Sequence, residues 1–125
     1  MSYMRFLRGV AVQNIFKILD LAFFEKAQAS GQFAGAGIDL KDGYIHFSTG
    51  EQLQETARLH FYGQTNLMLM AVAQDKLGEA LKWEASRGGQ LFPHLYGALN
   101  MADVHWAKPL PWIGLKHVFP AETFL

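Results

Sequence analysis

An uninterrupted apolar segment, Leu67–Val72 (LMLMAV), constrains the fold of this chain more than any other feature. Turn-forming residues bound the segment on both sides, and it contains no polar side chain. Short apolar runs of this kind are typical of strands that are buried on both faces. The segment therefore predicts a central strand that other elements must cover on both sides.

Two strand–helix units precede the central strand. Ile15–Leu19 is rich in β-branched and aromatic residues and predicts a strand. The helix after it, residues 20–31, can begin at Asp20 and end at Gly31. The second unit is an extended segment, Tyr44–Ser48, followed by a helix over about residues 50–62. The glycine-rich stretch between the two units, residues 32–43, reads as a long loop.

Three further extended segments follow the central strand: Ala80–Ala85, Leu91–Gly97 and Val104–Ala107. Proline is rare inside central strands, so Pro93 indicates an edge or irregular position for the second of them. Strands that precede and follow two main helices are typical of a single α+β domain. We expect this domain to span residues 15–125, with residues 1–14 as an N-terminal extension.

The composition excludes several classes of protein. The 125 residues carry eleven basic and eleven acidic side chains and no cysteine. A formal net charge of +0 makes nucleic acid an unexpected partner, and the lack of thiols rules out disulfides and cysteine–metal sites. No apolar run has the length of a transmembrane helix, and no signal peptide is recognisable. We expect a cytoplasmic protein that does not enter the membrane.

The segment before the second helix (GYIHFST, residues 43–49) is the best candidate for chemistry. Side chains alternate between the two faces of a strand. Ile45 and Phe47 would then face the core, whereas Tyr44, His46 and Ser48 would share the other face. Ser48 has a competing role, because a serine followed three residues later by glutamate also fits a capping box. Both roles are compatible if the following threonine is the true cap.

The later extended segments add further candidates. Glu84 can line a cleft as an acid, a base or a ribose-binding group, although charges on a short strand commonly face solvent. Its neighbour Trp83 can stack on a base. His94 and Tyr96 share a strand face, as His46 and Ser48 do.

Lys17, on the first strand, is a secondary candidate for ligand binding. No metal is expected, because the five histidines show no HxH, HxxxH or HExxH spacing. The roles of His60, His105 and His117 stay open.

Three segments in order resemble a known family: GYIHFST (43–49), LKWE (81–84) and LFPHLYG (91–97). The chain resembles the small, mainly bacterial family catalogued as domain of unknown function 952, over roughly residues 15–112. That resemblance implies an ADP-ribosyltransferase-like fold, in which small, bent, split β-sheets surround a cleft. In the enzymes of that superfamily the cleft holds NAD, and a histidine on an early strand contacts the ribose. His46 is similar in position to that histidine.

The resemblance implies a ligand site more directly than a reaction. No Glu-x-Glu pair and no Arg-His-Arg-Arg-like set is present, and the family has no established activity. The leading hypothesis is a cleft that binds a nucleotide-like ligand, with NAD as the candidate cofactor. In this hypothesis His46 and Glu84 are the candidate catalytic residues of an ADP-ribosyl transfer. The alternative is a non-catalytic interaction or sensing domain whose polar residues hold strands together and whose protein partner is unknown.

Overall fold

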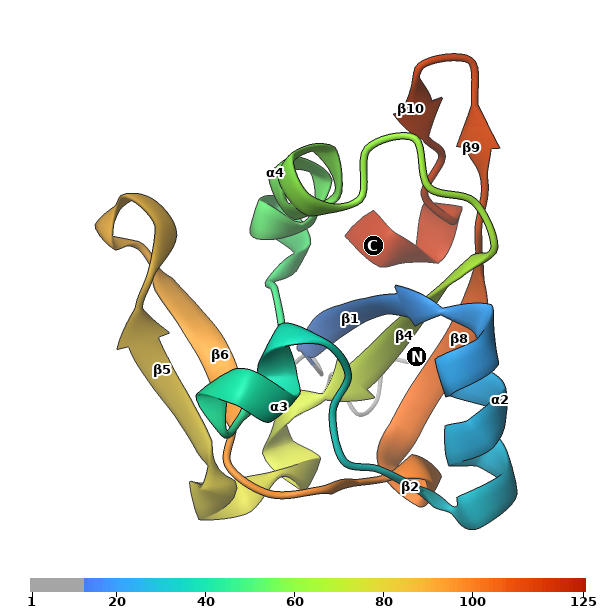
Figure 1. Cartoon of the computed structure of the whole chain (residues 1–125). Helices are drawn as coiled ribbons and strands as arrows, with labels where there is room; N and C mark the ends of the chain where they lie inside the picture. Colours follow the sequence, from blue (N-terminus) through green and yellow to red (C-terminus); the bar gives the residue numbers. More distant parts are fainter. Residues whose placement is uncertain (1–12) are drawn as a thin grey trace, which may run out of the picture.

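The computed structural model describes residues 13–125, which form a small α+β domain (Figure 1). The expected N-terminal extension lies outside the described residues except for Gln13 and Asn14, and Asn14 already belongs to the first strand. No helix within residues 13–125 is long and apolar enough to cross a membrane.

The central sheet is antiparallel and contains β1 (Asn14–Asp20), β4 (Leu67–Ala73) and β8 (Val104–Leu110) in the order β1-β4-β8. Every residue of β4 is buried, which confirms the prediction of a central strand covered on both faces. Met68 and Met70 pack into one apolar cluster, and Leu67 and Leu69 into another. The period-two alternation along β4 thus divides the core into two halves.

The two main helices cover opposite faces of this sheet. α2 (Leu21–Ser30) contributes Phe24 to the first cluster, and α4 (Gly50–His60) contributes Leu53 to the second. Both helices confirm the expected elements, with ends that differ by one or two residues. α2 ends at Gly31, which has a φ of 87° and donates its N–H to a carbonyl of the last turn. Glycine adopts this left-handed conformation without a steric cost.

The segment expected to be a loop, residues 32–43, contains two elements, and that expectation is wrong. β2 (Gln32–Phe33) pairs with β7 (Leu99–Asn100), and α3 (Ile38–Asp42) forms a short helix. α3 inverts the usual helical pattern, because Ile38 and Leu40 are exposed whereas Asp39 between them is buried. Hydrophobic periodicity does not detect a helix of this kind.

A second three-stranded antiparallel sheet projects to one side of the first (Figure 1). Its strands are β3 (Ile45–His46), β6 (Leu91–Leu95) and β5 (Leu81–Ala85), in the order β3-β6-β5. The expected strand Tyr44–Ser48 is therefore shorter than predicted. Beyond its end, backbone hydrogen bonds between Phe16 and Ser48 join the second sheet to β1.

The proline indicated an edge strand or an irregular segment, but Pro93 lies in β6, which is the middle strand. The N–H of Phe47 donates to the Pro93 carbonyl at 3.0 Å. Pro93 has no N–H that could donate to the Phe47 carbonyl. Because β3 ends at His46, this missing hydrogen bond falls just beyond the paired residues. A middle strand can therefore contain a proline here because its neighbour β3 is only two residues long.

The remaining elements are short. β9 (Trp112–Ile113) and β10 (Lys116–His117) form a hairpin in the tail of the chain. β8 continues past its expected end at Ala107 and includes Pro109, which an edge strand tolerates. Single 3-10 turns occur at Gln74–Lys76, Gly78–Ala80, Arg87–Gly89, Met101–Asp103 and Ala121–Phe124.

The cap of α4 is Thr49, and the capping box predicted from Ser48 and Glu51 is wrong. Thr49 Oγ1 accepts the N–H of Gln52, and the Gln52 side chain accepts the N–H of Thr49. The Ser48 hydroxyl bonds to Thr56 instead. Ser48 is thereby released from the capping role that competed with a place in the site.

Replacing Thr49 by alanine is expected to lower the free energy of unfolding by about 1 kcal/mol, because the backbone N–H of Gln52 loses its acceptor. Glu51→Ala is the matched control and should change stability by less than about 0.5 kcal/mol. Urea unfolding of both variants checks this. A larger effect at Glu51 than at Thr49 would contradict the assignment of the cap.

Candidate functional site

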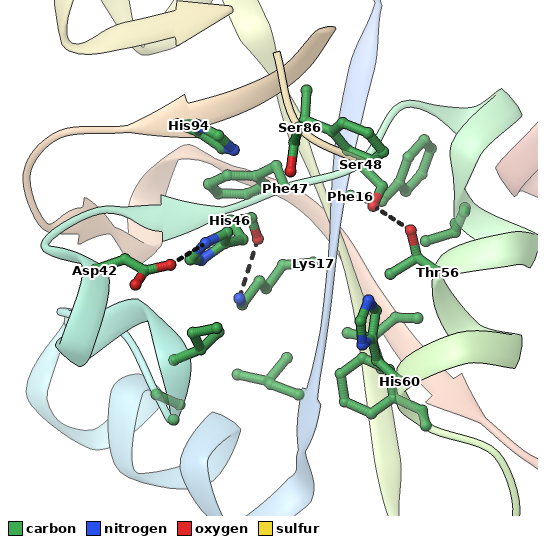
Figure 2. Close-up of a pocket in the computed structure, with 18 of the residues that line it drawn as sticks. Phe16, Lys17, Asp42, His46, Phe47, Ser48, Thr56, His60, Ser86 and His94 are labelled. Carbon is green, nitrogen blue, oxygen red and sulfur yellow. Dashed lines mark hydrogen bonds and ion pairs between the residues drawn. The ribbon is translucent and has the colours of Figure 1, made fainter. Parts of the chain in front are cut away.

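A cavity of about 600 Å³ opens where β1, β3, β6 and α4 meet (Figure 2). Its lining includes five of the residues that the sequence singled out: Lys17, Tyr44, His46, Ser48 and His94. The rest of the lining mixes aromatic side chains with a few polar ones. Cavities of this size and composition are typical of small-molecule sites.

A buried carboxylate, Asp39, organises one wall of the cavity. Only 2% of Asp39 is exposed, and it accepts hydrogen bonds from two side chains and two backbone N–H groups. Lys17 Nζ lies 2.8 Å from Oδ2, and His46 Nδ1 lies 2.7 Å from Oδ1. Burial alone would raise the pKa of Asp39, but the bonds from His46 and the charge of Lys17 lower it to about 2. Asp39 is therefore a carboxylate at neutral pH.

Lys17 lies almost fully inside the protein and holds two elements together. Its ammonium donates to Asp39 on α3 and, at 3.0 Å, to the backbone carbonyl of His46 on β3. Burial lowers the pKa of Lys17, and the Asp39 carboxylate partly offsets that effect. The arrangement fixes α3 against β1 and β3, and so sets the position of the His46 ring.

The His46 imidazole is held at both nitrogens. Nδ1 faces Asp39, and Nε2 lies 3.0 Å from Oδ2 of Asp42, the last residue of α3 (Figure 2). A carboxylate can only accept, so Nδ1 donates its hydrogen to the buried Asp39. The Asp42 side chain is partly exposed. A ligand group can replace it at Nε2 without disturbing the inner bond.

His94 forms the second anchored imidazole. It pairs with His46 across the strands, and their ring centres are 5.3 Å apart. His94 is only 3% exposed, its Nδ1 lies 2.7 Å from Glu84 Oε1, and Tyr44 stacks on its ring at 4.2 Å. No residue within 13–125 bonds to its Nε2. Because Nδ1 donates to a carboxylate, Nε2 is the ring nitrogen that remains for a hydrogen bond with a ligand.

Glu84 and Tyr96 fix the orientation of the His94 ring through a chain of hydrogen bonds. The Tyr96 hydroxyl donates to both Glu84 oxygens, at 2.9 and 3.1 Å. The bonds from His94 and Tyr96 lower the pKa of Glu84, and the bond to Glu84 raises the pKa of Tyr96. Glu84 therefore stays an acceptor that orients the His94 ring.

These residues lie within a segment that matches a known family. The family model described as protein of unknown function (DUF952) matches residues 18–107. The chain belongs to the DUF952 family. The resemblance seen in the sequence is thereby confirmed at the level of the family, and the matched segment includes both histidines and the carboxylates that anchor them.

Solved structures of one protein are similar to this DUF952 domain. The crystal structure of protein CC0527 from Caulobacter crescentus is 47% identical, with a TM-score of 0.85, covering 90% of this chain and 99% of that one. The solution NMR structure of the same protein is 53% identical, with a TM-score of 0.72, covering 78% of this chain and 84% of that one. The comparison with curated proteins found no match.

Three of the candidate residues do not line the cavity of the DUF952 domain. Glu84 reaches the site through His94, and Tyr96 lies behind Glu84 and against the ring of Tyr44. Trp83 alternates with Glu84 along β5, is 40% exposed and takes no part in the cavity. Glu84 is therefore placed to position a histidine and does not contact a ligand in the cavity directly.

Sequence reasoning missed several polar residues of the site, among them Asp39, Asp42, Thr56 and Arg87. Asp39 and Asp42 lie in the segment that read as a loop. The signal that could have found them is Gly37 and Gly43, which bracket α3 with positive φ angles of 56° and 85°. Glycines so spaced can begin and end a short helix.

The other histidines of the DUF952 domain have separate roles. His60, in the last turn of α4, lines the cavity. His117 is buried and donates to the Gln64 carbonyl at 2.9 Å, which is a structural contact. His105 is exposed, and its ring lies 3.3 Å from the Asn14 side chain. Among residues 13–125, no three metal-binding side chains lie close enough together to hold an ion.

Proposed function

We propose that this DUF952 domain binds a nucleotide-like ligand, of the NAD or ADP-ribose type, in the cavity around His46. The observation that carries the proposal is the pair of anchored histidines. Each has Nδ1 bonded to a carboxylate, and both line one cavity of about 600 Å³. Imidazole nitrogens presented in this way can bond to ribose hydroxyls.

The remaining lining suits the other parts of such a ligand. Aromatic and aliphatic side chains, among them Phe16, Phe23 and Phe92, provide apolar area for a base or a nicotinamide ring. Ser48 and Thr56 add hydroxyls on the side of α4. A mostly apolar cavity with a few convergent polar groups is the usual design of a cofactor site.

An ADP-ribosyltransferase-like fold and a related transfer reaction are part of the proposal. Two small sheets that diverge beside a cavity, with a histidine on an early strand, support this relationship. In such a reaction His46 would contact the ribose, and Glu84 would act by positioning His94 as the base. Because folds host many functions, ligand binding is the part to test first.

Millimolar ADP-ribose or NAD is expected to raise the thermal unfolding midpoint of the protein by several degrees, and nicotinamide alone by less. A ligand at 100 times its Kd stabilises the folded state by about 2.7 kcal/mol. The shift should disappear in His46→Ala and persist in His105→Ala, a histidine outside the cavity. Differential scanning fluorimetry of each variant with and without ligand measures this. The absence of a shift with all three compounds in the wild type would exclude a NAD-type ligand.

A protein-interaction role is the second candidate, and exposed apolar side chains favour it. Ile38 and Leu40 on α3 are 60% and 67% exposed, next to the carboxylate that holds His46. Ile38 also lines the cavity, so Leu40 is the residue to replace. Leu40→Ser would impair such a role, whereas His46→Ala would not. The two candidates therefore respond to different substitutions.

A further inference from the structure

Arg87 carries a positive charge at the cavity without a carboxylate partner. It lies on the 3-10 turn between β5 and β6 and is half-buried in the lining. Its guanidinium carbon is 4.7 Å from the centre of the Phe92 ring, and its Nη2 donates to Thr56 Oγ1 at 3.3 Å. Within residues 13–125 Arg87 makes no ion pair. The stacking and the single bond hold the group in place and leave most of its five N–H donors unused.

The other charged residues of the lining differ from Arg87. Lys17 is paired with Asp39, so its charge is compensated. Asp42 is bonded to His46. Asp20 lies far from the Ser48 end of the cavity. Ser48 pairs with Phe16, and Asp20 is four residues further along β1, about 13 Å at strand spacing. Glu55 on α4 is near enough for the charge of Arg87 to help lower its pKa, but both of its oxygens are bonded to Arg58. Arg87 therefore has no carboxylate bonded to it.

One hydroxyl group bonds to the guanidinium directly, and two more lie in the same part of the cavity lining. Ser48 Oγ and Thr56 Oγ1 are 2.9 Å apart, and Thr56 bonds to both Arg87 and the Gln52 carbonyl. Ser86, next to Arg87 in the chain, also lines the cavity. In Figure 2 Ser48, Ser86 and Thr56 lie toward one end of the drawn lining, and Asp42 and His46 toward the other. Arginine with hydroxyl groups is a common combination for binding phosphate oxygens.

We propose that Arg87, with Ser48 and Thr56, forms a subsite for phosphoryl groups at the α4 end of the cavity. The subsite deepens the function proposed above and rests on it for the orientation of the ligand. The pyrophosphate bridge of the ligand lies against Arg87, and its sugar reaches the two histidines. The guanidinium fork binds two phosphate oxygens, and the hydroxyls of Ser48 and Thr56 rotate to donate to them.

Calorimetric titration of the full chain with inorganic pyrophosphate tests the subsite. The wild type is expected to bind pyrophosphate, and Arg87→Gln to lose roughly 10- to 100-fold in affinity. Arg87→Lys keeps the charge and should fall between them, because lysine lacks the bidentate fork. Lys116→Gln is the control, since Lys116 is an exposed cation on β10 outside the cavity. Wild-type protein that does not bind pyrophosphate, or Arg87→Gln that binds it equally well, overturns the subsite.

Titration with ADP-ribose separates failure of the subsite from failure of the proposed function. If ADP-ribose binds wild type and Arg87→Gln equally but not His46→Ala, the nucleotide site stands and the phosphoryl subsite is wrong. If pyrophosphate binding depends on Arg87 but ADP-ribose binds no more tightly than pyrophosphate, the subsite stands and the nucleotide ligand is wrong. Unfolding midpoints of the unliganded variants show that each variant is folded.

Discussion

Asp39→Ala is expected to reduce the free energy of unfolding by about 3–5 kcal/mol, the usual cost of breaking a buried ion pair from one side. The substitution leaves the Lys17 ammonium, with a side chain only 11% exposed, without its carboxylate. It also removes the acceptor of the His46 ring and of two backbone N–H groups. Urea unfolding followed by circular dichroism measures the loss. Near-UV circular dichroism should also change, because the Tyr44 ring lies 4.6 Å from the ring of His46, which the carboxylate helps to fix.

Two further variants show whether the buried charge is the cause. Asp42→Ala removes a partly exposed carboxylate from the same short helix and should cost less than about 1 kcal/mol. Lys17→Met combined with Asp39→Ala removes the orphaned ammonium and should recover part of the stability. Equal losses at Asp39 and Asp42 would show that the pair with Lys17 contributes little.

Acid is expected to weaken the fold through the same carboxylate. The pKa of Asp39 is about 2 in the folded protein, against 3.8 for the unperturbed group. The folded state therefore binds the proton more weakly than the unfolded state does. The resulting stabilisation, about 2 kcal/mol, is complete above about pH 5 and is lost as the pH falls toward 2.

Unfolding by urea at several pH values between 7 and 2.5 measures this dependence. Asp39→Asn cannot ionise, so its stability should fall less steeply below pH 4 than that of the wild type. Other carboxylates with lowered pKa values, such as Glu84, keep their own partners and are the same in both proteins. Parallel curves for the two proteins would contradict the assigned role of Asp39.

The strands and helices that bury an apolar face were predictable from the sequence. Burial imposes periodicities of two residues on strands and 3.6 residues on helices. These periodicities are visible in β4, in β1 with α2, and in the apolar stripe of α4. α3 was not predictable, because its buried residue is Asp39 and its exposed ones are Ile38 and Leu40. Hydrogen bonds from Lys17 and His46 to Asp39 hold this helix in place. The local hydropathy pattern does not reveal such bonds.

The candidate site was predictable residue by residue but not as an arrangement. Alternation along the strand predicted one face for His46 and Ser48, and both line the cavity, but Phe47, predicted to face the core, lines it as well. That His94 lies opposite His46 depends on strand order, and Pro93 had indicated an edge or irregular position for β6. Arg87 and Thr56 are 31 residues apart in the chain, and only the folded domain brings them together.

Pro93 has a consequence for how β3 and β6 can pair. If β3 slipped by one residue, His46 would turn from the cavity to the opposite face. If it slipped by two, so that the buried Ile45 faced Pro93, the Ile45 carbonyl would lack a donor inside the ladder. In the observed register the missing N–H falls opposite Phe47, just past the end of β3. The residue that interrupts the hydrogen bonds of this sheet thus selects the alignment in which two imidazoles stand side by side.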